Sequence, residues 1–281
     1  MNDVFFDPSQ SDFLTDWTKK HENTESDIAL RNDSTATEYE EIAINEAPIF
    51  IIGFWQGGGE LIYDVIRHDS QFGSVSLNAT SDKNFTDFLS GKTDFLQELI
   101  TPSDTSLWEA DCLRLAQKTM KLSGRKRFLC HNPGYMNRLE LITDLFPDAK
   151  FVRVFRNPQS ILERVERNLN ADENAKNRIL QVYDKMYSEY EAEKLFVLPE
   201  NLVEIPFEEF EVDSMNCIKR IYSKLEIPGF ERAEAALEYG VSQILPALKE
   251  EQAYSDKALE SIISFLDNAQ KSERYDPHSL A

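Results

Sequence analysis

The chain has 281 residues, of which 41% are hydrophobic, so it can bury a full core as one large domain or as two smaller ones. Its 30 Lys and Arg residues stand against 50 Asp and Glu residues, and the formal net charge of -20 repels nucleic acid and anionic membrane surfaces. No apolar run reaches the roughly 18 residues that a membrane span needs, and the first residues lack the basic start and apolar core of a secretory signal. We therefore expect a cytoplasmic protein with no nucleic-acid partner and no membrane span.

Residues 1–46 differ from the rest of the chain and are predicted to form an acidic N-terminal extension. They hold 12 acidic residues against three basic ones, with many Ser, Thr and Asn residues between short apolar clusters. The charge and polarity favour partial disorder. A helix-like spacing of apolar side chains favours instead a short segment that docks on the body; these side chains are Phe5, Phe6, Phe13, Leu14 and Trp17.

From Pro48 onward, short apolar strands alternate with helical patterns. The stretch PIFIIGFWQGGGELIYDVI predicts a buried strand, a tight glycine turn and an amphipathic helix. A polar stretch from Ser74 to Ser106 with short helical patterns follows, and then a helix from Trp108 to Leu122. Further along, KRFLCHNP and PDAKFVRVFRNP each predict a strand that ends at an Asn-Pro pair, with the helix MNRLELITDLF between them.

The last predicted elements complete an α/β pattern. Helices over about Gln159 to Leu169 and Asp172 to Glu193 lead to the strand NLVEIPF, and another helix begins near Asp213 and closes at EIPGF. Short apolar strands joined by helical crossovers are typical of a parallel sheet flanked by helices. The four expected strands are Phe50–Gly53, Phe128–Cys130, Phe151–Phe155 and Leu202–Ile205.

Ligands of such sheets bind at the carboxyl ends of the strands. Three loops should therefore converge on one edge, and they are Gly53–Glu60, His131–Gly134 and Arg156–Pro158. A helical stripe of Tyr183, Met186, Tyr187 and Tyr190 is expected to belong to the core. Neither a disulfide framework nor a metal site is predicted, because the three cysteines are far apart and form no CxxC pair.

Three stretches resemble, in order and separation, the sulfotransferases that use phosphoadenosine phosphosulfate: PIFIIGFWQGGGELIYDVI, HNPGYMNRLELITDLFPDAKFVRVFRNPQSI and LPENLVEIPFEEFEVDSMNCIKRIYSKLEIPGF. The resemblance covers residues 48 to 281 and implies a sulfotransferase-like domain over residues 47–281 with a P-loop-like architecture. It also implies phosphoadenosine phosphosulfate as co-substrate, no metal, and transfer of the sulfuryl group to a hydroxyl or amine. The chemistry requires positioned N–H groups and cations, because the donor is multiply charged and its bridging oxygen gains charge as the sulfuryl group leaves.

The resemblance assigns the donor site to the first loop and to two arginines, Arg156 and Arg164. In the family the first loop commonly reads Pro, Lys or Arg, Ser, Gly, Thr, Thr, whereas this chain has Trp55, Gln56, Gly57, Gly58, Gly59 and Glu60. Only Gly58 matches. Arg156 matches the arginine that the resemblance assigns to the ribose phosphate of the donor. Arg164 replaces a Ser that often helps this arginine, and His131 replaces a common Lys before Asn-Pro.

Each of these residues also has a structural interpretation. Gly57 to Gly59 form either a tight turn or an anion cradle, and Arg156 contacts either a phosphate or an acid of the chain. Glu60 is a first-turn acid on the helix dipole and has the two arginines as possible partners. His131 is expected to be solvated or to cap a loop rather than to take part in catalysis.

Two functions follow from this pattern. The chain is either a sulfotransferase that tolerates these loops or a non-catalytic relative that serves as a binding or assembly protein, and the acceptor, the catalytic base and the oligomeric state are not assigned. The missing loop cation and the added carboxylate both weaken phosphate binding, so the sequence predicts that Gln56→Arg with Glu60→Thr restores it.

Overall fold

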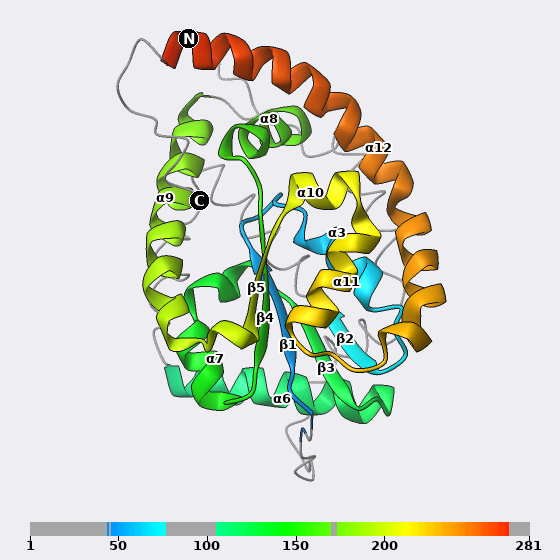
Figure 1. The fold of residues 1–281 in the computed structure, drawn as a ribbon. Helices are drawn as coiled ribbons and strands as arrows, with labels where there is room; N and C mark the ends of the chain where they lie inside the picture. The colour runs from blue at the N-terminus through cyan, green and yellow to red at the C-terminus, as the bar shows by residue number, and fades with distance from the viewer. Residues whose placement is uncertain (1–43, 45, 77–104, 170–172, 270–281) are drawn as a thin grey trace.

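The computed structural model describes residues 44, 46–76, 105–169 and 173–269 (Figure 1). The predicted N-terminal extension lies almost entirely outside these ranges, as do most of the polar stretch after Ser74 and the end of the chain. Within the described ranges, no helix combines the length and the apolar character that a membrane crossing requires.

The centre of the fold is a five-stranded parallel sheet in the order β2-β3-β1-β4-β5. Its strands are β1 (Ile49–Gly53), β2 (Phe72–Ser76), β3 (Arg127–His131), β4 (Lys150–Phe155) and β5 (Leu202–Pro206). The four predicted strands are confirmed. β2 was not predicted, because its sequence FGSVS is interrupted by a glycine and two serines and lacks an apolar run.

Helices cover both faces of the sheet, so each strand sends alternate side chains into two separate cores. Phe50 and Ile52 of β1 pack with α6 (Thr105–Ser123), α7 (Leu139–Leu145), α8 (Pro158–Leu169) and α9 (Glu173–Glu193). Ile49 and Ile51 pack with α3 (Gly59–Ile66), α10 (Phe207–Val212), α11 (Ser214–Lys224) and α12 (Phe230–Ala269). This double cover is why the central strands read as continuous apolar runs.

Two helical regions differ from the sequence prediction. The helix predicted from Met136 is divided at Arg138 into a 3₁₀ turn (Pro133–Asn137) and α7. The 40-residue α12 was not predicted; it contains Gly240 and Pro246, which break the pattern of good helix formers. Gly240 allows a close approach to α3, since a Cβ there would lie 3.1 Å from the Val65 Cα (Figure 1).

The strand order creates a switch point between β1 and β4. The chain leaves β1 toward β2 on one side of the sheet, whereas it leaves β4 toward β5 on the other. Loops that diverge in this way open a crevice at the carboxyl ends of the strands, where α/β proteins bind ligands. The first predicted loop and Arg156 both lie at this crevice.

Candidate functional site

The loop after β1 makes a tight turn into α3. The Gly57 N–H donates to the Phe54 carbonyl over 3.0 Å, and Gln56 has a φ of 63°. Gly58 precedes the first helical residue with a φ of 92°, and a Cβ at this position would lie 2.1 Å from the Phe207 ring. Backbone conformation and packing therefore both require glycine at position 58.

The side chains of this loop are bound by Arg164 of α8. The Arg164 Nε donates to the Gln56 Oε1 over 2.8 Å, and an Arg164 terminal nitrogen lies 3.3 Å from the Glu60 Oε1. The exposed fractions of the Arg164 and Glu60 side chains are 14% and 11%. Of the two partners that the sequence offered Glu60, Arg164 is bonded to it in the structure.

Arg156 follows β4 and forms a buried ion pair with Glu211 of α10. The two charged groups lie 2.9 Å apart, and each side chain is only 5% exposed. The Arg156 guanidinium also lies over the Phe207 ring, 4.7 Å from its centre. Of the alternatives that the sequence left open for Arg156, the pair with an acid is present in the structure.

His131 ends β3 and is buried, so the expectation of a solvated or loop-capping histidine is wrong. Its exposed fraction is 2%, its Nδ1 lies 3.3 Å from the Ser76 Oγ, and its ring stacks on Tyr63 of α3. Burial lowers the pKa of His131 to about 4, against the opposing effect of the Glu60 charge. The imidazole is therefore neutral at pH 7.

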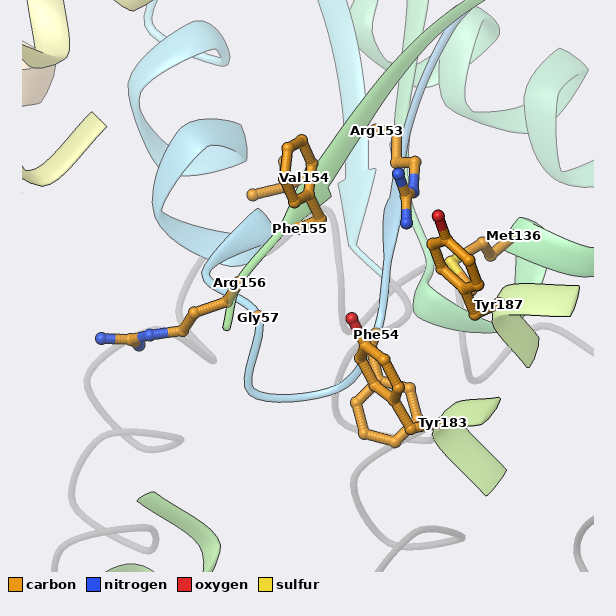
Figure 2. A pocket seen from close by; sticks show the side chains of 9 residues that line it. All are labelled: Phe54, Gly57, Met136, Arg153, Val154, Phe155, Arg156, Tyr183 and Tyr187. Atoms are coloured by element: carbon orange, nitrogen blue, oxygen red, sulfur yellow. The ribbon is translucent and has the colours of Figure 1, made fainter. Parts of the chain in front are cut away.

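A pocket lies beside the loop, and Gly57 and Arg156 both line it (Figure 2). It has room for about one water molecule. Figure 2 shows the Arg156 side chain pointing away from the aromatic side chains on the opposite side of the pocket.

The aromatic side of the pocket was not predicted as part of a site. Tyr183 and Tyr187 of α9 line it, although their stripe was assigned to the core, where Met186 and Tyr190 do lie. Tyr183 packs edge-on against Phe54 with 5.2 Å between ring centres. The spacing of two tyrosines four residues apart could have indicated a shared surface, but it does not distinguish a core from a pocket.

Arg153 is a second buried cation at this pocket. Its guanidinium lies 2.7 Å from the Glu204 carboxylate and 4.2 Å from the centre of the Tyr190 ring. The Arg153 and Tyr190 groups hold the pKa of Glu204 below its usual value, although burial opposes them. Arg153 is therefore engaged within the fold.

Two ion pairs neutralise the arginines that lie closest to the loop. Arg164 pairs with Glu60 and Arg156 pairs with Glu211, while the imidazole of His131 is neutral. Among the described residues, no three His, Cys, Asp or Glu side chains are grouped so that they could hold a metal ion. Each of the three arginines described at the crevice, Arg153 included, is thus already paired with a carboxylate of the chain.

A parallel sheet covered by helices on both faces, whose first strand runs through a glycine turn into a helix at the switch point, defines a doubly wound α/β protein. Residues 48–232 match the sulfotransferase family, and the chain belongs to that family.

The relatives of the chain are distant. The omega-hydroxy-beta-dihydromenaquinone-9 sulfotransferases Stf3 of Mycobacterium bovis and Mycobacterium tuberculosis are each 19% identical to it, and each alignment covers 68% of this chain. The chain spans 66% of the length of these relatives, slightly less than two thirds. The crystal structure of sulfotransferase STF9 from Mycobacterium avium aligns with a TM-score of 0.53 and 12% identity over 83% of this chain and 72% of that one. This likeness supports the fold.

Proposed function

We propose that this chain is a sulfotransferase-family protein that binds phosphoadenosine phosphosulfate weakly or not at all and acts as a binding or assembly protein rather than as an enzyme. The single observation that carries this proposal is the cancellation of charge in the crevice. Both arginines are bonded to carboxylates of the same chain. A nucleotide with several negative charges would have to displace Glu60 or Glu211, or bind beside them.

The states of Gly57 and His131 also support the proposal. The Gly57 N–H, which the family resemblance would offer to a phosphate, already donates to the Phe54 carbonyl. The buried, neutral His131 supplies no positive charge at pH 7. The loop therefore has one N–H donor fewer for an anion, and His131 adds no cation.

The second candidate is a working sulfotransferase, and one observation favours it. The Arg164 guanidinium reaches the Gln56 side chain, at the loop position where the family commonly has its cation. The chain therefore keeps a cation beside the loop, although its source is α8 and not the loop itself.

The domain division is part of the proposal. The family match begins at residue 48, which supports a sulfotransferase-like domain that starts near residue 47 and an extension of residues 1–46 before it. The acceptor remains unassigned.

Calorimetric titration tests the proposal. The purified chain is titrated with adenosine 3′,5′-bisphosphate and with phosphoadenosine phosphosulfate at physiological salt, and an active member of the family is titrated in the same buffer as the positive control. We expect a dissociation constant weaker than about 100 μM for both nucleotides, which corresponds to less than about 5.5 kcal/mol of binding free energy. Submicromolar binding with sulfuryl transfer to any hydroxyl or amine acceptor would establish the second candidate instead.

A further inference from the structure

The cation beside the donor loop comes from residue 164 instead of residue 56. Gln56 carries no charge, but the guanidinium of Arg164 lies 2.8 Å from its amide oxygen and is only 14% exposed. An arginine that extends from α8 to the loop brings a guanidinium to the start of α3, where a phosphate would also be bound. The loop thus has a neighbouring cation that a comparison confined to the loop would miss.

Glu60 places a carboxylate at the same point. It stands in the first turn of α3, where the first N–H groups have no acceptor within the helix, and its Oε1 lies 3.3 Å from the Arg164 guanidinium. A negative group is favoured there both by the helix dipole and by the arginine. These are the two features that would also attract a phosphate, so the carboxylate of Glu60 and a phosphate compete for one environment.

We propose that Arg164 is the relocated donor-site cation of this chain and that Glu60 is its intramolecular competitor. On this proposal, which rests on the proposed function above, Glu60 is the residue that determines whether the crevice accepts the terminal phosphate of an adenine nucleotide. The cation is masked, and it is released when the carboxylate is neutralised.

A mutant cycle with one ligand tests the proposal. The parent protein, Glu60→Gln, Arg164→Ala and the double variant are titrated with adenosine 3′,5′-bisphosphate by calorimetry. Gln keeps the volume and the acceptor oxygen of Glu60 but removes the charge. We expect Glu60→Gln to bind at least about tenfold more tightly than the parent, which is about 1.4 kcal/mol. The gain should disappear in the double variant and shrink as salt rises, because it is electrostatic.

The matched control is Glu209→Gln. This substitution changes the net charge by the same amount, but Glu209 pairs with Arg220 on the exposed side of α10. It should leave nucleotide affinity within about twofold of the parent. An equal gain from Glu60→Gln and Glu209→Gln would mean that net charge alone sets the affinity, and it would overturn the proposal.

The outcomes separate this inference from the proposed function. A folded Glu60→Gln protein, checked by circular dichroism, that binds no better than the parent overturns the inference while weak binding of the parent still supports the proposed function. If the parent already binds adenosine 3′,5′-bisphosphate with a dissociation constant below about 1 μM, the proposed function fails, yet the cycle still measures the coupling between residues 60 and 164. Glu60→Thr, which installs the residue common in the family, serves as the second variant if Glu60→Gln does not fold.

The inference also revises the double variant suggested by the sequence. With Gln56→Arg and Glu60→Thr together, a second guanidinium would lie beside Arg164. The Glu60 carboxylate that now neutralises Arg164 would be absent. We expect Glu60→Thr alone to bind the bisphosphate more tightly than this double variant. Adding Arg164→Ser to the double variant should relieve the repulsion and recover affinity; if the double variant already exceeds Glu60→Thr alone, Arg164 does not occupy the position of the loop cation.

Discussion

Neutralising Glu211 should destabilise the fold far more than neutralising a surface acid of the same helix. Glu211→Gln leaves the Arg156 guanidinium, which is 5% exposed, without the carboxylate 2.9 Å away. At an effective dielectric constant near 20, two unit charges at this distance attract each other by about 6 kcal/mol, before the cost of removing both from water. Removing one charge of a buried ion pair typically costs about 3–5 kcal/mol of unfolding free energy. Because Gln retains a hydrogen-bond acceptor, we expect Glu211→Gln to cost about 3 kcal/mol.

Glu209→Gln is the matched control for this experiment. Glu209 and Arg220 are closer, at 2.7 Å, but their side chains are 52% and 42% exposed. If distance determined the energy, the exposed pair would matter more; because solvent screens it, its loss should cost at most about 1 kcal/mol. The two substitutions are compared by urea unfolding at pH 7, where the free energy of unfolding is read from the midpoint and slope.

A double substitution checks the cause. Arg156→Met with Glu211→Leu removes both charges, so it should be more stable than Glu211→Gln, in which one charge stays buried. Equal losses for Glu211→Gln and Glu209→Gln, or a loss below about 1 kcal/mol for the former, would refute the view that burial makes this pair structural.

Two further predictions concern the same crevice. Gly58→Ala should cost about 3 kcal/mol of unfolding free energy, because it combines a φ of 92° with a Cβ 2.1 Å from Phe207. The control Gly124→Ala, with a φ of 61° and nothing within 4 Å of the added Cβ, should cost only about 1 kcal/mol. Equal costs for the two variants in urea unfolding would show that the Phe207 contact does not matter. The pKa of His131 is lowered to about 4, so below pH 6.5 the unfolded chain binds a proton that the folded chain does not, and stability should fall by up to about 3 kcal/mol as the pH drops from 6.5 to 4. His131→Asn should flatten this part of the stability profile, and parallel profiles for the two proteins would contradict the assignment.

Most of the sheet could be predicted from the sequence, because a parallel strand buried on both faces needs a local run of apolar residues. IFIIG in β1 and KFVRVF in β4 are such runs, and every residue of β1 is buried. FGSVS in β2 carries too few apolar residues, and two of its five positions are only half-buried at the edge of the sheet. Its place in the sheet comes from pairing with β3, which the local sequence does not encode.

The location of the site could also be predicted, but its charge pairing could not. In a parallel sheet the order of strands and helices is enough to bring the loops after β1 and β4 to the same edge. The partners are a different matter, since Arg156 and Glu211 are 55 residues apart and Arg164 and Glu60 are 104 residues apart. FEEFE presents several acids at similar local positions, and only the packing of α10 against the loop determines which one meets Arg156.

These pairings change what the altered loop means. Counting cations along the loop suggests a site that has lost its charge, whereas Arg164 and Arg156 lie beside the loop and their charges are cancelled by Glu60 and Glu211. A site that lacks cations can recover phosphate affinity only if a new positive charge is introduced. A site whose cations are masked should recover it when one carboxylate is removed, and of the two carboxylates Glu60 is the better choice, because Glu211 supports a more deeply buried arginine and its loss should destabilise the fold. Nucleotide binding by a folded Glu60→Gln protein therefore distinguishes a site that lacks cations from a site whose cations are neutralised by carboxylates of the chain.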